Sequence, residues 1–437
     1  MRPRLGISTF DTLCLGVNAI VGSGIFMFPG QLAREVGPAS ILAFAVCALL
    51  LVFVALCYAE MGSMFRQSGG PYVYATAAFG PRAGFAVGWI SWVTSVFSWA
   101  AVANAVSSGL DYLVPVFHQP AVAKVVTLSL ILGFGGLNYR GVKLGARAIN
   151  LFTVGKLLPL FLFVLVGCWF VSPANFHPFW PAGGTGSFPH AVFLSLWALQ
   201  GFEVTPYPAG ESENPQRAVP IAVLGSLATA AILYVLIQTV AVGVHPGLAA
   251  GGVDARPLAD AAGRFMGHAG GVLLAVGAVI SIVGTSAGDA LGTPRLLSAL
   301  AEGGHLPSRL ARPHGRFGTP GEAILITTGF TALAAGTLGL TELVDLANLA
   351  VILQYIATCG AVFWLRIRRP DLPRLFRLPA ARPIALAGCA VSLWLACEVT
   401  SHELLIGAAV LAAGLAATFG YRGWMRRRTR EGPDTRA

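Results

Sequence analysis

The residues of most chemical interest interrupt two otherwise apolar stretches of the sequence. The first stretch contains Gly22-Ser23-Gly24-Ile25-Phe26, and the second contains Gln200-Gly201-Phe202-Glu203 followed by Pro206 and Pro208. Glycine weakens a helix by about 1 kcal/mol and proline by about 3 kcal/mol relative to alanine. If these stretches cross a bilayer, the freed backbone groups must face a cavity, a ligand or other protein groups. A helix that begins at such a point attracts a carboxylate, which indicates a site for a small anion-bearing molecule. Close packing of two helices at small residues is the alternative interpretation.

Three ionisable residues, Lys156, Glu203 and Asp289, also lie within apolar stretches. A charged side chain inside a bilayer needs a partner, a proton or a wet cavity. The long stem of Lys156 could carry its amine to the interface. Alternatively, Lys156 stays buried and gains and loses a proton, since removal of water disfavours a charged amine. Asp289 either pairs with another helix or binds a cationic group of a substrate.

Two further polar residues allow a structural and a functional interpretation. Asn104 lies at depth in an apolar stretch, where it either bonds to a neighbouring helix or faces a cavity. Glu60 is placed at the edge of the second apolar stretch, and we interpret it as an interfacial charge or the partner of a gate.

The composition is that of a protein that crosses a membrane many times. Of the 437 residues, 55% are hydrophobic and only 11% are charged, whereas a soluble domain carries about 25% charged residues. The seven cysteines form no C-x-x-C pair and are interpreted as small apolar residues. No H-E-x-x-H, nucleophile elbow or paired Asp-rich motif occurs, which argues against a membrane enzyme. We expect no metal and no cofactor.

The apolar stretches predict twelve membrane spans. Their approximate limits are 10–31, 39–64, 82–113, 121–138, 147–171, 188–209, 218–243, 271–300, 321–339, 342–366, 382–400 and 403–423. With both termini in the cytoplasm, 24 of the 29 Lys and Arg residues fall in cytoplasmic segments, four fall in outer loops, and Lys156 lies within a span. This asymmetry predicts cytoplasmic termini and a multi-pass protein of the cell (inner) membrane. It also accounts for the net charge of +10 without a nucleic-acid partner.

Several sequence blocks resemble the amino acid–polyamine–organocation superfamily of transporters. Gly22-Ser-Gly-Ile-Phe26 resembles the G-S-G-I-F signature of that family. The other similar blocks, in chain order, are Tyr58-Ala-Glu-Met-Gly-Ser63, Ser68-Gly-Gly-Pro-Tyr-Val-Tyr74, Glu211-Ser-Glu-Asn-Pro-Gln-Arg-Ala-Val-Pro220, Pro294 to Pro307 with Phe317-Gly-Thr-Pro320, and Arg368 to Pro379. Together they cover the first ten predicted spans.

The resemblance implies an all-α polytopic membrane protein with twelve transmembrane helices. Its expected core is a five-plus-five inverted repeat of the LeuT-like type, in which helices 1 and 6 are broken. On this expectation the first repeat occupies residues 1–171 and the second occupies 188–366. Two appended helices occupy 382–423, and a basic cytoplasmic tail occupies 424–437.

The resemblance also implies roles for individual residues. In the family, the segment matching Gly22 to Ile25 holds the carboxylate of an amino acid, and the segment matching 197–201 takes its ammonium. Trp197 looks like an aromatic gate, with Phe202 beside it. Lys156 looks like the lysine that replaces a sodium ion in sodium-independent members. The expected substrate-binding residues are Ile20, Gly22, Ser23, Gly24, Ile25, Asn104, Trp197, Gln200, Gly201, Glu203 and Asp289.

The predicted function is secondary active transport of amino acids by alternating access, without sodium, through proton symport or amino-acid exchange. The predicted partners are an amino acid substrate, the lipid bilayer and a coupling proton, while a partner subunit stays open. Two alternatives remain at this point: a polyamine or organic-amine transporter of the same fold, and a membrane sensor that binds amino acids without moving them.

Overall fold

The computed structural model describes residues 8–107, 110, 114–140, 146–181, 184–207, 209–250, 256–402, 404–414 and 416. These residues form α-helices and short 3₁₀-helices, and no β-strand occurs among them. The α-helices of the first part are α1 (Thr9–Ile20), α2 (Gly24–Val36), α3 (Ser40–Met64), α4 (Pro71–Phe79), α5 (Pro81–Asn104), α7 (Pro120–Tyr139) and α8 (Ala146–Gly167). Those of the second part are α9 (Gly184–Leu199), α10 (Pro215–Val244), α11 (Pro257–Glu302), α12 (Gly321–Thr337), α13 (Leu340–Arg368) and α14 (Ala381–Ala396). The expected basic tail, 424–437, and the first seven residues lie outside the described residues.

Both predicted interruptions are present. α1 ends at Ile20 and α2 begins at Gly24, so the chain is not helical between them. α9 ends at Leu199, and the short 3₁₀-helix η5 (Phe202–Val204) follows it. Gly201 between them has φ 127°, a left-handed conformation that a residue with a Cβ rarely adopts.

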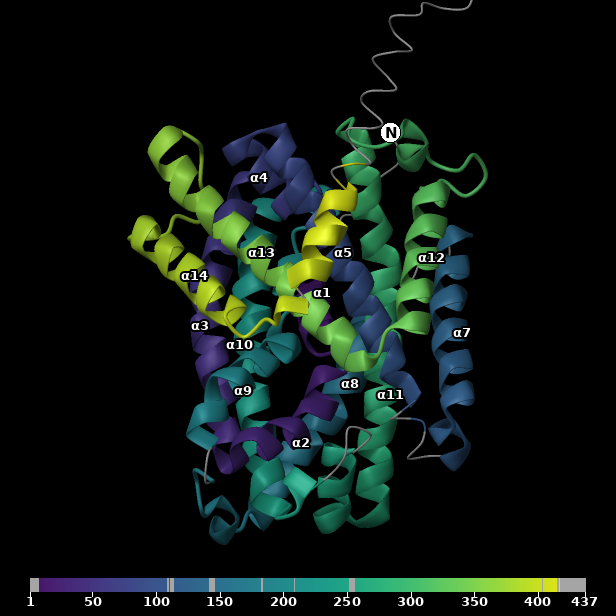
Figure 1. Ribbon diagram of the computed structural model, residues 1–437, viewed down its shortest axis with the longest axis vertical. Helices are drawn as coiled ribbons and strands as arrows, with labels where there is room; N and C mark the ends of the chain where they lie inside the picture. The colour runs from purple at the N-terminus through teal and green to yellow at the C-terminus, as the bar shows by residue number, and fades with distance from the viewer. Residues whose placement is uncertain are drawn as a thin grey trace, which may run out of the picture.

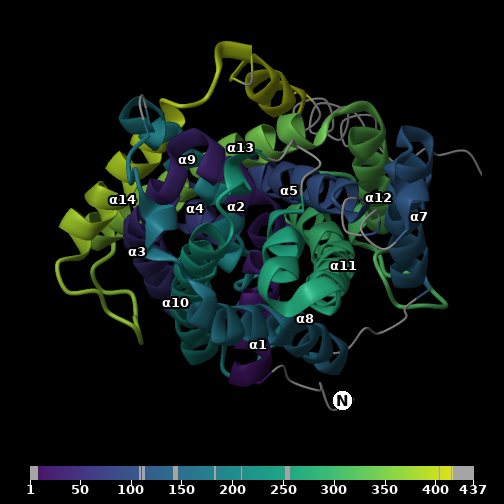
Figure 2. The same cartoon turned by 90° about the horizontal axis from the view of Figure 1, so that it is seen from below.

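The two interrupted segments lie together within one bundle. α2 packs on α9, while α1 packs on α8, α10 and η5. In both views α7 and α12 lie side by side at one edge of the molecule, and α3 and α14 lie at the opposite edge (Figures 1 and 2). A continuous cluster of buried apolar side chains connects the interrupted segments to α3, α10 and α13. The interruptions are therefore held inside a packed core.

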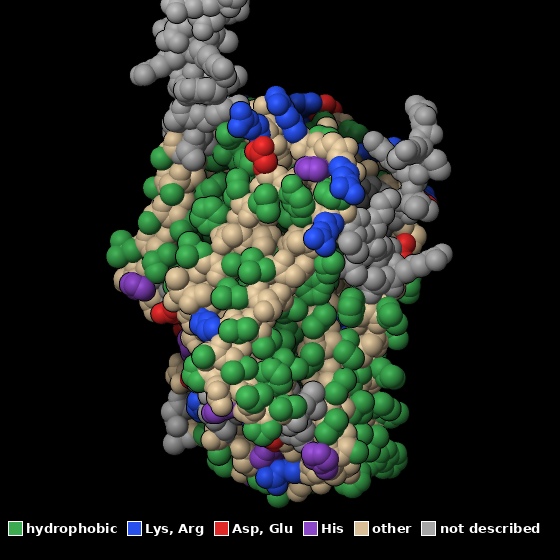
Figure 3. All heavy atoms as spheres, turned by 90° about the vertical axis from the view of Figure 1, so that its right-hand side faces the viewer, with side chains coloured by type: hydrophobic (Ala, Val, Ile, Leu, Met, Phe, Trp, Pro, Cys, Tyr) green, Lys and Arg blue, Asp and Glu red, His purple; other side chains and the backbone are tan. Residues whose placement is uncertain are grey.

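The surface and the helix lengths are those of a multi-pass membrane protein. Seven helical stretches of the described residues are long and apolar enough to cross a bilayer. They are 24–64, 81–104, 120–139, 150–170, 215–244, 257–302 and 340–368. The interruptions divide other predicted spans into shorter pieces, such as α1 and α9. On the face shown in Figure 3, hydrophobic side chains cover the middle and most charged side chains gather toward the two ends.

Glu60 links three segments at one end of the bundle. Its buried carboxylate, 1% exposed, accepts hydrogen bonds from Nε (2.8 Å) and Nη2 (2.5 Å) of Arg366 on α13. It also accepts from the backbone N–H of Leu378 (2.9 Å), and Nε of Arg374 lies 3.4 Å from its Oε1. Glu60 thus joins α3 to α13 and to the loop that leads into α14.

We expect Glu60→Ala to lower the free energy of unfolding by about 3–5 kcal/mol, because it leaves two arginines without their buried partner. The measurement is the thermal unfolding midpoint of the purified protein in detergent. Asp371→Ala is the matched control, since this carboxylate is 71% exposed in its pair with Arg369 and such pairs contribute at most about 1 kcal/mol. Equal midpoints for the two variants would contradict the linking role of Glu60.

Candidate functional site

The N-terminus of α2 opens at the first interruption without a side-chain cap. Ser23 occupies the cap position but makes no capping hydrogen bond, and its Oγ is buried with no hydrogen-bond partner. The first N–H groups of any α-helix lack partners within the helix and carry a partial positive charge. This helix end is therefore suited to bind the carboxylate of a ligand.

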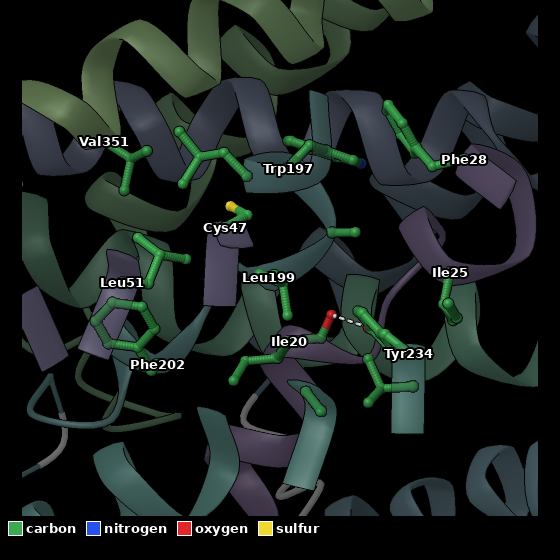
Figure 4. Packing of buried hydrophobic residues seen from close by; sticks show 14 of the residues in the cluster. Ile20, Ile25, Phe28, Cys47, Leu51, Trp197, Leu199, Phe202, Tyr234 and Val351 are labelled. Atoms are coloured by element: carbon green, nitrogen blue, oxygen red, sulfur yellow. Dashed lines mark hydrogen bonds between the residues drawn. The ribbon is translucent and has the colours of Figure 1, made fainter. Parts of the chain in front are cut away.

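Three of the carbonyl groups freed at the same interruption, those of Ile20, Val21 and Gly22, accept hydrogen bonds from side chains of other helices. Tyr234 Oη on α10 donates to the carbonyl of Ile20 at 3.0 Å, a contact that Figure 4 shows. Ser281 Oγ on α11 lies 3.0 Å from the carbonyls of both Val21 and Gly22. Because the protein engages these three acceptors, they are less available to a ligand than the N–H groups at the start of α2.

Lys156 provides the cation at this interruption. Its side chain is fully buried in the middle of α8, so the structure does not show it reaching for the interface. Nζ donates to the carbonyls of Asn18 (2.9 Å) and Val21 (2.5 Å), and it lies 3.3 Å from Thr285 Oγ1. The ammonium is thus held by oxygen atoms of α1, of the interruption that follows it and of α11, as a bound metal cation would be.

The second interruption is stabilised by its own carboxylate. Oε2 of Glu203 accepts the N–H of Gly201 at 2.8 Å and the hydroxyl of Tyr355 on α13 at 3.1 Å. The end of α9 leaves backbone carbonyls unpaired within the helix, as every helix C-terminus does. These carbonyls carry a partial negative charge, which favours an ammonium group.

The two interruptions touch at their glycines. A Cβ built on Gly24 would lie 2.9 Å from Cα of Ala198 in α9. A Cβ built on Gly201 would lie 2.7 Å from the backbone of both Ala19 and Ile20. Only residues without side chains allow this approach, so the positive end of α2 and the negative end of α9 border the same space.

A cavity occupies this space. It is lined by Ala19, Ile20, Gly22, Ser23, Gly24, Thr94, Ser95, Ser98, Val102, Trp197, Gln200, Gly201, Glu203, Val204, Tyr207, Thr285 and Asp289. The lining includes nine of the eleven predicted substrate-binding residues. Besides Ser23 Oγ, both polar atoms of the Gln200 side chain and Oδ2 of Asp289 are buried without a hydrogen-bond partner. Buried polar atoms are usually satisfied, so these atoms point to a polar ligand.

The structure places four other predicted residues outside this lining. Ile25 is fully buried in the apolar core, and the amide of Asn104 lies 3.3 Å from the carbonyl of Ala335 on α12. Phe202 stacks on Tyr355 with ring centroids 5.5 Å apart and is fully buried. Lys156 reaches the cavity wall only through Thr285. Packing and helix–helix hydrogen bonding account for the first three positions.

Several lining residues were not predicted. Thr94, Ser95 and Ser98 are close in sequence on α5, and Thr285 lies one helical turn before Asp289. Hydroxyls spaced in this way within an apolar span were the available signal. Gln354 orders this wall, because its amide bonds to Ser91 (2.8 Å) and Thr94 (2.7 Å). No signal in the sequence connects Gln354 to residues 260 positions away. Within the described part of the chain, no three metal-binding side chains gather.

The arrangement suits a small zwitterion, and the comparison with known sequences decides the family. The protein-family model for amino acid permeases matches residues 7–410 of the chain. The chain belongs to the amino acid permease family. This family lies within the amino acid–polyamine–organocation superfamily, as the sequence blocks predicted, and it makes the chain a membrane transporter and not an enzyme.

Relatives with different names are similar to this permease over most of its length. The branched-chain amino acid permease BcaP of Bacillus subtilis is 31% identical, covering 85% of this chain and 83% of the relative. The methylthioribose transporter of the same organism is 28% identical, covering 95% and 93%. Mouse cationic amino acid transporter 4 is 28% identical, covering 87% of this chain and 63% of its own length.

Proposed function

We propose that this permease moves amino acids across the membrane by alternating access, with the substrate backbone held between the two interruptions. The observation that carries the proposal is the contact of two oppositely charged helix ends at one cavity. The uncapped start of α2 would hold the carboxylate, chiefly at Ser23 and Gly24. The end of α9, at Trp197 to Gly201, would hold the ammonium. Ile20, Gly22, Gln200 and Glu203 complete the proposed binding residues.

The proposed gate is Trp197. Its indole is 6% exposed, lines the cavity and lies beside Gly24. A small rotation of this ring would open or cover the space between the two interruptions. The position of Trp197 where they meet supports this role. Phe202 packs among aromatic rings away from the lining, so we assign it to packing of η5. Ile25 and Asn104 are likewise assigned to support of the site.

We propose that transport is independent of sodium and is coupled to protons or to amino-acid exchange. The support is Lys156, whose ammonium occupies a group of oxygens from Asn18, Val21 and Thr285. An ammonium held there does the electrostatic work of a metal cation, and an amine can also release a proton. Loss of that proton would weaken the link between α8 and the first interruption, because a neutral amine binds carbonyl oxygens less strongly than an ammonium, and this gives coupling a physical route.

The proposed topology is twelve spans with both termini in the cytoplasm of a cell (inner) membrane. Residues 1–171 and 188–366 would form the two inverted repeats, since each contains one interrupted helix near its beginning. The appended pair would be 382–423. Charge asymmetry along the sequence supports the orientation.

The names of these relatives refer to branched-chain amino acids, methylthioribose and cationic amino acids. They support amino-acid transport but do not choose one substrate. The uncapped start of α2 argues against a polyamine or organic-amine substrate. This helix end favours an anionic group, and such ligands have none.

The test is uptake of labelled amino acids into liposomes that contain the purified protein. We expect saturable uptake that increases with an inward proton gradient or with unlabelled amino acid inside, and no change when choline replaces sodium. Protein-free liposomes are the control. Binding detected by a shift of the unfolding midpoint, with no flux under any gradient, would contradict transport and favour a sensor. Uptake of polyamines alone would contradict the amino acid assignment.

A further inference from the structure

Asp289 is an acidic residue that the proposed site does not yet use. It lies on α11 and borders two adjoining cavities, the one described above and a second one that extends along α1 and α11. The second cavity is lined by Leu15, Asn18, Ala19, Ser95, Val204, Tyr207, Thr285, Gly288, Asp289, Leu291, Gly292, Thr293 and Arg295. Oδ2 of Asp289 is buried and has no hydrogen-bond partner. A buried carboxylate oxygen without a partner is unfavourable unless a ligand, a proton or water in the cavity satisfies it.

The hydrogen bonds described for the nearby cations Lys156 and Arg295 go to groups other than Asp289, although the charge of Lys156 lies close enough to interact with that of Asp289. The ammonium of Lys156 contacts the carbonyls of Asn18 and Val21 and the hydroxyl of Thr285. The guanidinium of Arg295, two turns further along α11, donates to the carbonyl of Leu291 at 2.8 Å. Glu203, the other acid of the cavity, is occupied by Gly201 and Tyr355. Asp289 is therefore the acid that remains for a ligand.

The balance of charges then limits the substrate. On the proposed function, on which this inference rests, the two helix ends match the carboxylate and the ammonium of an amino acid. Among the described lining residues, the first cavity contains two acids and neither Lys nor Arg, while the second cavity is also lined by Arg295. A neutral zwitterion would leave Oδ2 of Asp289 without a hydrogen-bond donor, whereas a substrate with a second positive charge would supply one. We propose that Asp289 selects amino acids with a cationic side chain.

The geometry agrees with this substrate class. Thr285, which borders both cavities, lies one helical turn before Asp289, so the two positions are about 6 Å apart along the helix axis. The hydroxyls of Ser95 and Tyr207 border both cavities as well. They can accept the remaining hydrogen bonds of an ammonium or guanidinium group.

The first test compares ligands that differ by one charge. Arginine is paired with citrulline, and lysine with norleucine, because the members of each pair have nearly the same shape. Dissociation constants are measured from the ligand-induced shift of the unfolding midpoint of the wild-type protein. We expect the cationic member of each pair to bind at least about tenfold more tightly, because a close pair of opposite charges shielded from water contributes at least this much to affinity. Equal binding within both pairs would overturn the inference.

The second test removes the charge from the protein. Asp289→Asn should weaken arginine and lysine binding about 100-fold and change citrulline and norleucine binding little, while Asp289→Glu should retain the cation preference. Glu302→Gln is the matched control, since it removes an exposed acid of the same helix, and it should leave both pairs unchanged. If Asp289→Asn does not fold, the comparison of the paired ligands on the wild-type protein still tests the inference.

The outcomes also separate this inference from the proposed function. Saturable uptake of neutral amino acids with no preference for cationic ones would overturn the role of Asp289 while leaving transport intact. An equal loss of all four ligands in Asp289→Asn would assign the residue to the support of Lys156 and would overturn selection. No binding and no uptake of any amino acid would contradict the proposed function itself.

Discussion

Replacement of Gly201 by alanine is expected to reduce amino-acid uptake by at least about 100-fold while the protein still inserts and purifies. Two physical effects act together at this residue. Its φ of 127° is unfavourable for any residue with a side chain. The added Cβ would also lie 2.7 Å from the backbone of Ala19 and Ile20, well inside the normal contact distance of about 3.5 Å. The two interruptions would have to separate, and a displacement of about 1 Å at a site that positions a substrate can remove two orders of magnitude in rate.

The matched control is Gly329→Ala on α12. This glycine is exposed, and a Cβ there would meet nothing within 4 Å. Because alanine favours a helix by about 1 kcal/mol over glycine, this variant should keep full uptake and a similar or higher unfolding midpoint. Uptake by Gly201→Ala equal to that of the control would show that contact between the interruptions is not needed for transport.

Both interruptions could be predicted because their cause is local. Gly22 and Gly24 in the first predicted span and Gly201 in the sixth weaken a helix wherever they occur. The charge asymmetry and the apolar composition also act without tertiary information, so the membrane class followed directly from the sequence. The family assignment agrees with these features. What the sequence could not show is that Gly24 and Gly201 pack against the opposite interruption.

Pairings between distant residues could not be predicted. Glu203 reaches Tyr355 across 152 positions, and Glu60 reaches Arg366 across 306 positions. A carboxylate in an apolar stretch indicates that it has a partner. Which residue is that partner depends on how the helices pack. Asn104 shows the same limit, because only the fold directs its amide to α12 and not to the cavity.

Lys156 lies between these two cases. Its burial in an apolar stretch indicated an unusual environment, yet the sequence allowed either a path to the interface or a buried amine. The structure selects the buried amine and adds its contacts at the first interruption. The contacts connect one ionisable group to the backbone that borders the cavity. This connection is the physical basis for the second large effect that we expect.

Replacement of Lys156 by glutamine should abolish proton-driven accumulation while exchange of internal for external amino acid persists. Glutamine keeps N–H donors for the carbonyls of Asn18 and Val21 but carries neither a charge nor an exchangeable proton near neutral pH. The hydrogen bonds to the carbonyls of the interruption are therefore partly retained, whereas the coupling of transport to protons is removed. We expect the initial rate of uptake driven by an inward proton gradient to fall at least about tenfold, as loss of a positioned proton carrier typically requires. The pH dependence of the remaining rate should become flat.

Lys124→Gln on α7 is the control for loss of a lysine. Its Nζ also donates to a backbone carbonyl, that of Ala335 at 2.6 Å, but it lies away from both cavities. This variant should keep the pH profile of the wild type. A pH profile of Lys156→Gln that matches the wild type would reject the proton role. A variant that still binds substrate but loses both exchange and accumulation would give a different result. It would assign Lys156 to maintaining the shape of the interruption. A group that serves only proton coupling is not needed for exchange, because exchange moves no net proton.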